Sequence, residues 1–179
     1  MSTDGNTNAG TLRVIEVTSG WAMGEVNNCL AVVWADQPDG EMMRRRATAL
    51  EDLCRRHPGS SALVEIVEST SKPPSDATRK IAMEVFRQLA NDLSAIAFVV
   101  EGSEVRTAIT RAVITGMLFF VRQMQPSRVF KRPADMMEWV GHRIRRTDTG
   151  FGPTVISSLE ELRTLLHRER AKSHVSAHA

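Results

Sequence analysis

The chain has few cysteines, little net charge and no long apolar run, and each of these shortages excludes a class of protein. Its 179 residues contain two cysteines. Cys29 and Cys54 both lie within apolar patterns, which predicts buried free thiols and excludes a disulfide scaffold. Lysine and arginine number 23 against 21 acidic residues, a net charge of +2 that argues against a dedicated nucleic-acid binder. The most apolar stretch, 112–121, is shorter than the ~20 residues that a membrane span requires.

The N-terminal segment has none of the features of a secretory signal. Residues 1–10 are rich in Asn, Thr and Gly, and they carry neither a basic start nor an apolar core. We therefore expect a disordered N-terminus on a cytoplasmic protein of bacterial type.

Apolar runs of strand length alternate with segments of helical periodicity along most of the chain. Strands are expected at 11–17, 28–35, 62–67, 95–100 and 128–130, with a glycine-bracketed turn at 20–24. Helices are expected at 41–56, from Ser75 to 93, at 104–123 and at 134–142. This order predicts an α/β fold in which helices flank a mixed, mainly parallel sheet whose first two strands form an antiparallel pair.

The C-terminal region is predicted to form a separate amphipathic helix. A polar linker at 143–156 separates the domain of residues 11–142 from a helix at 157–172, and a short tail follows at 173–179. The helix carries a stripe of leucines: Leu159, Leu162, Leu165 and Leu166. Because an isolated helix of this length is marginal in water, it must dock on its own domain, on another subunit or on a partner. We expect self-association through this stripe and hence a homo-oligomer.

Two further stretches carry a resemblance to a known fold family. Residues 95–123, AIAFVVEGSEVRTAITRAVITGMLFFVRQ, form a buried strand, a short turn and a helix with apolar spacing. In residues 128–140, RVFKRPADMMEWV, a short strand leads into a small helix with an aromatic residue near its end. These stretches resemble the STAS-like, or SpoIIAA-like, family. The sequence also resembles a pattern found in a widespread bacterial group. The matching residues are Trp34/Pro38, 55–58, 73–75 and Glu101-Gly102.

The resemblance implies an SpoIIAA-like fold and a non-enzymatic module for protein interactions. In some STAS-like domains, phosphorylation of a Ser or Thr in an Asp-Ser-x-Gly-like turn switches binding to regulators of sigma factors. The corresponding region here, 68–76, has hydroxyl groups but lacks that pattern and contains two prolines. Some relatives are similar to lipid-binding CRAL-TRIO domains, which implies a small apolar ligand as an alternative.

Two loops at the carboxyl ends of predicted strands are the candidate binding face, because open α/β sheets place functional loops there. The first holds the candidate interaction and phosphorylation residues Ser69, Thr70, Ser71 and Ser75. A phosphate on Ser75 would lie at a helix N-terminus, although helix capping alone also explains a serine there. The neighbouring loop contributes Glu101, Ser103, Glu104 and Arg106.

Other polar groups have simpler interpretations. The run Arg44-Arg45-Arg46 is expected to be a solvated helix face. His174 and His178 would suit a metal only on a stable helix, so no metal site is predicted. No phosphate-binding loop or other cofactor motif is present, and no cofactor is expected.

These observations predict a non-catalytic regulatory protein-interaction module of STAS-like type in bacterial signalling, with a protein partner and no bound nucleic acid. The first alternative is a carrier of a lipid or other small apolar ligand, whose cavity would be lined by Met117, Phe119 and Phe120 facing inward. The second alternative is an enzyme of unrecognised type, which requires a cleft with convergent polar groups.

Overall fold

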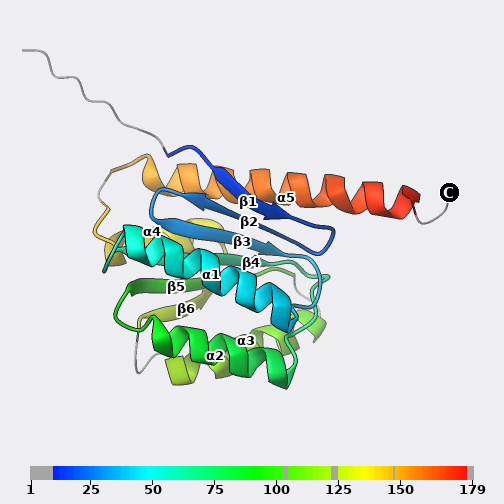
Figure 1. The fold of residues 1–179 in the computed structure, drawn as a ribbon, viewed down its shortest axis with the longest axis horizontal. Helices are drawn as coiled ribbons and strands as arrows, with labels where there is room; N and C mark the ends of the chain where they lie inside the picture. The colour runs from blue at the N-terminus through cyan, green and yellow to red at the C-terminus, as the bar shows by residue number, and fades with distance from the viewer. Residues whose placement is uncertain (1–9, 103–104, 122–124, 147, 177–179) are drawn as a thin grey trace, which may run out of the picture.

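The computed structural model describes residues 10–102, 105–121, 125–146 and 148–176, which form a six-stranded sheet with helices on both faces (Figure 1). The strands are β1 (Arg13–Val17), β2 (Trp21–Val26), β3 (Cys29–Trp34), β4 (Ser61–Val67), β5 (Leu93–Val100) and β6 (Ser127–Phe130). The helices are α1 (Gly40–Arg56), α2 (Asp76–Gln88), α3 (Val105–Val121), α4 (Pro133–Arg143) and α5 (Phe151–Ser176). The strands lie in the sheet in the order in which they occur in the sequence.

The sheet is α/β in class and mixed in direction. β1, β2 and β3 pair antiparallel, whereas β3, β4, β5 and β6 pair parallel. The expectation of a mainly parallel sheet is therefore wrong for the first half of the sheet, which is antiparallel. The cause is a strand that the sequence pattern does not reveal, β2. It lies between β1 and β3 and pairs antiparallel with each, so the prediction that the first two expected strands pair with one another is also wrong.

β2 occupies residues that the sequence predicts as a turn. All six of its residues are buried, and Trp21 pairs with Trp34 of β3, with the two rings stacked 5.0 Å apart. Gly24 lies within the strand, where it pairs with Val14 of β1 and Ala31 of β3, and its neighbours leave no room for a side chain. An added Cβ there would lie 2.7 Å from Leu12 Cδ1 and 3.3 Å from Leu162 Cδ2. The glycine thus permits close packing and does not mark a turn.

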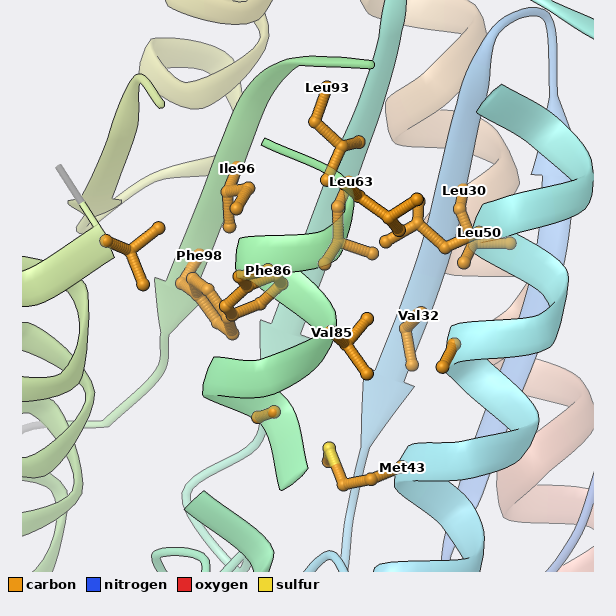
Figure 2. Packing of buried hydrophobic residues seen from close by; sticks show 14 of the residues in the cluster. Leu30, Val32, Met43, Leu50, Leu63, Val85, Phe86, Leu93, Ile96 and Phe98 are labelled. Atoms are coloured by element: carbon orange, nitrogen blue, oxygen red, sulfur yellow. The ribbon is translucent and has the colours of Figure 1, made fainter. Parts of the chain in front are cut away.

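One face of the sheet is covered by α1, α2 and α3. Each of these helices connects two neighbouring parallel strands among β3 to β6. Because such crossovers are right-handed and proceed in one direction across the sheet, their helices lie on the same face. Alternate strand residues such as Leu30 and Val32 of β3 point to this side, where they meet Leu50 of α1 (Figure 2). Phe86 of α2 and Phe98 of β5 belong to the same buried cluster (Figure 2).

The other face is covered by α4 and α5. α5 begins at Phe151, within the expected linker, and runs to Ser176 alongside β1 and β2 (Figure 1). Leu159, Leu162 and Leu166 have no exposed surface and pack with alternate residues of the strands, while Leu165 is half-buried. The leucine stripe therefore docks on the chain's own sheet, the first of the three alternatives. Self-association stays a prediction, and it requires a different surface.

Candidate functional site

The predicted interaction loop after β4 is fastened to the end of β3. Thr70 Oγ1 donates a hydrogen bond to the carbonyl oxygen of Ala35 at 3.0 Å, and Ser71 Oγ donates to that of Asp36 at 2.8 Å. Ser71 is buried, with 2% of its surface exposed. Both hydroxyl groups hold the loop in place, so a phosphate on Ser71 requires this contact to break.

Ser69 and Ser75 are exposed residues at the two ends of the same loop. Ser75 is the N-cap of α2, because its Oγ accepts a hydrogen bond from the backbone N–H of Thr78 at 3.2 Å. Ser69 lies against Gly102, whose added Cβ would be 2.9 Å from Ser69 Cβ. The loops after β4 and β5 therefore meet, as the ends of neighbouring parallel strands do.

Side chains of α5 reach an acidic residue beyond the carboxyl end of each of β3, β4 and β5. The contacts are Arg163 with Glu101 and Glu68, His167 with Glu68, and Arg170 with Asp36, at distances of 2.6–3.3 Å. Part of the predicted binding face is therefore covered by the chain's own C-terminal helix.

Arg163 is the centre of these contacts. Its burial disfavours the charged form, but the carboxylates of Glu101, Glu160 and Glu68 outweigh that effect and raise its pKa. The guanidinium therefore stays charged and ties α5 to two strand ends. Of the neighbouring predicted loop, Glu101 takes part in this contact. Ser103, Glu104 and the side chain of Arg106 lie outside the described residues.

α3 carries three of the large apolar side chains that are exposed in the described residues. Ile109, Phe119 and Phe120 are 53%, 63% and 64% exposed, and the two phenylalanine rings meet edge to face. The alternative function, a carrier of an apolar ligand, predicts that both phenylalanines face an internal cavity. Their exposure shows that this prediction is wrong. α3 is apolar around most of its circumference, which is typical of a helix that another surface covers.

A groove of about 770 Å³ runs between α3 and α2. Its apolar wall includes Met83, Val113, Met117 and Phe120. Three cations of α2 line it as well: Arg79, Lys80 and Arg87. The two acidic residues of the lining are partly neutralised, since Asp76 pairs with Arg79 and Glu84 with Arg87. The groove is thus apolar on its α3 side and carries an excess of positive charge on its α2 side.

A buried ion pair lies beneath α1, at residues that the sequence reasoning did not single out. Arg46 Nη1 donates to Glu65 Oε1 at 2.6 Å, and Trp34 Nε1 donates to Glu65 Oε2 at 2.9 Å. Arg46 is 2% exposed and Glu65 is 1% exposed. The expectation of a solvated face at Arg44-Arg45-Arg46 is therefore wrong for Arg46. The signal that was available is Glu65, a lone charge within an otherwise apolar strand.

Neither a metal site nor a membrane-spanning helix occurs in the described part of the chain. Its His, Cys, Asp and Glu residues form no group of three that could hold a metal ion. Among the same residues, every helix is too short or too polar to cross a bilayer. A scan of known protein-family models finds no match to the sequence, and a search of curated proteins finds none either.

Proposed function

We propose that this chain is a non-catalytic regulatory module that binds an acidic amphipathic helix of a partner protein in the groove between α2 and α3. The exposed apolar face of α3 carries the proposal. The resemblance to STAS-like domains, which we retain as a proposal for the fold, favours the same class of function.

The exposed aromatic side chains are the first reason for a protein partner. Phe119 and Phe120 leave well over half of their surface in water, and removing such apolar surface from water favours association. Aromatic residues are enriched among those that dominate the binding energy of interfaces. A partner that covers these two side chains removes their apolar surface from water, which favours binding.

The shape and charge of the groove indicate what kind of segment fits. A trough between two helices accepts a third helix, whose apolar residues at positions i, i+3 and i+4 fill the groove. Val105–Val121 contains no acidic residue, and the facing α2 contributes Lys80, for which the structure shows no ion pair within the described residues. Acidic side chains beside the apolar stripe of the incoming helix would complement this rim.

Photocrosslinking from the groove tests this proposal. Benzoylphenylalanine in place of Phe120 is expected to yield an adduct with a distinct protein in the native host, mapping to an acidic helical segment. The adduct yield should fall in a second variant that also carries Lys80→Glu. The purified partner should then bind Phe120→Ser about tenfold or more weakly than the unchanged protein, a loss typical of a buried aromatic anchor.

The matched control is Val175→Ser, which removes an exposed apolar residue, 73% exposed, from the end of α5. Binding of the partner by this variant should be unchanged. An adduct only with a second copy of the chain or only with lipid would overturn the proposal. Equal affinity of Phe120→Ser and Val175→Ser for the partner would also contradict it.

A further inference from the structure

Gly116 is a residue of α3 that the chain's own fold does not explain. It lies in the interior of the helix, where a glycine disfavours folding about fivefold relative to alanine. Among the described glycines, Gly59 and Gly102 have a positive φ and Gly116 does not, so its backbone conformation is one that any residue adopts. An added Cβ at Gly116 would meet no packing neighbour within 4 Å among the described residues. The glycine thus disfavours folding, and no contact of the described chain requires it.

Gly116 forms one corner of a four-residue hole on the α3 wall of the groove. The other corners are Val113, Met117 and Phe120, and all four residues line the groove. Their spacing is i, i+3, i+4 and i+7, which makes them neighbours on one face of a helix. Between packed helices, such a hole receives one side chain of the facing helix. Three corners of this α3 hole are apolar and the fourth has no side chain, so it has room for a large apolar group.

The α2 wall of the groove repeats the same spacing with mostly charged residues. Two overlapping sets of four line the groove there: Asp76, Arg79, Lys80 and Met83, and Lys80, Met83, Glu84 and Arg87. A helix in the groove therefore meets an apolar hole on α3 and charged holes on α2. This difference sets the rotation of the incoming helix, because its largest apolar side chain must turn toward Gly116 and its charged side chains toward α2.

We infer that Gly116 determines which helix the groove accepts: the α3 hole takes one apolar side chain, of leucine size or larger, from the acidic helix of the partner. The inference rests on the docking function proposed above and adds the partner residue that the groove selects. A partner with alanine at this position leaves the hole unfilled, and unfilled space between packed side chains weakens their contact. A side chain added at position 116 occupies the hole and excludes the incoming residue.

The first test concerns the unbound chain and needs no partner. Gly116→Ala should lower the equilibrium constant of unfolding about fivefold, because alanine favours the helix and its Cβ enters open space. Urea unfolding measures this constant. An unchanged or raised constant would overturn the inference, since it would mean that the chain's own fold requires a glycine at this position.

The second test measures binding with a defined probe, a fluorescein-labelled synthetic peptide of the segment that crosslinks to position 120. Fluorescence anisotropy gives its affinity. Gly116→Leu should weaken binding of this peptide tenfold or more, because the leucine fills the α3 hole. The matched control is Thr115→Leu, which adds the same side chain at an exposed position of α3 that does not line the groove. This control should bind the peptide with unchanged affinity.

A complementary change in the peptide identifies the selected residue. Each large apolar residue of the peptide is replaced by alanine in turn. At one position, and not at the others, the substituted peptide should bind the unchanged protein about tenfold more weakly than the original peptide does. The same substituted peptide should bind Gly116→Leu at least as well as it binds the unchanged protein. Such a reversal of preference is expected when the two side chains compete for the same space.

The outcomes separate this inference from the docking function. Equal affinities of Gly116→Leu and Thr115→Leu for the peptide would overturn the inference and leave the docking function standing. A peptide in which no position shows the reversal would do the same. Absence of any crosslinked segment would overturn the docking function, and the inference with it.

Discussion

Removal of one partner from the buried Arg46–Glu65 pair should destabilise the protein far more than removal of both. Glu65→Gln leaves the guanidinium of Arg46 buried at 2% exposure without its counter-ion. Breaking a buried ion pair in this way costs about 3–5 kcal/mol. Because the whole domain is held by only about 5–15 kcal/mol, such a loss approaches the limit of stability.

The reverse change, Arg46→Met, leaves a buried carboxylate and should cost a similar amount. The double variant Arg46→Met/Glu65→Gln removes both charges, and the glutamine oxygen still accepts from the indole N–H of Trp34. We expect it to lie within about 2 kcal/mol of the unchanged protein, since a neutral replacement of a buried pair is often tolerated. The two single changes are therefore expected to be strongly non-additive.

Urea unfolding followed by tryptophan fluorescence measures these free energies. The control is an exposed ion pair, Arg132 with Asp135, for which Arg132→Met should cost far less than either single change in the buried pair. A loss of less than about 1 kcal/mol in Glu65→Gln would refute the reasoning, because it would mean that the charge of Arg46 reaches water or another partner. A double variant as unstable as the sum of the single variants would refute it as well.

Three further predictions follow from burial and charge. Leu162→Ala should destabilise the protein by about 2–5 kcal/mol in urea unfolding, whereas the half-buried Leu165→Ala should cost clearly less, since Leu162 has no exposed surface. Burial raises the pKa of the Cys29 thiol to about 12 and also raises that of Cys54, so both should resist alkylation in the native protein at neutral pH and react on unfolding; rapid native labelling would contradict this. Burial alone would raise the pKa of Glu25, but hydrogen bonds from two arginines outweigh it and lower the pKa. The contribution of Glu25 to stability should therefore be complete above its unfolded-state pKa of about 4.3 and be lost as the pH falls through the lower folded-state pKa. Glu25→Gln should remove this part of the pH dependence of the free energy of unfolding. An unchanged pH dependence in Glu25→Gln would contradict the lowered pKa of Glu25.

Sequence patterns alone determine the centre of this fold. The near-continuous apolar runs that become β3, β4 and β5 are predicted correctly, because strands covered on both faces need apolar side chains in both directions. The amphipathic spacing of α1 and α2 also predicts these helices correctly. Ser75 is recognisable as the N-cap of α2 because its hydroxyl group accepts a hydrogen bond from a backbone N–H of the first helical turn. These features depend on interactions within a few residues or on burial of a whole segment.

Only the tertiary structure decides the features that depend on residues far apart in the chain. Gly24 is typical of a turn by composition, but it pairs with strands on both sides, and the close approach of Leu12 and Leu162 explains why the position has no side chain. Arg46 belongs to a run of arginines that predicts a solvated helix face. Only the position of Glu65 on the facing strand shows that the charge of Arg46 is balanced in the interior. A sequence pattern records the hydrophobicity of each residue, whereas the partner of a charge or the space around a glycine is set by chain segments that folding brings together.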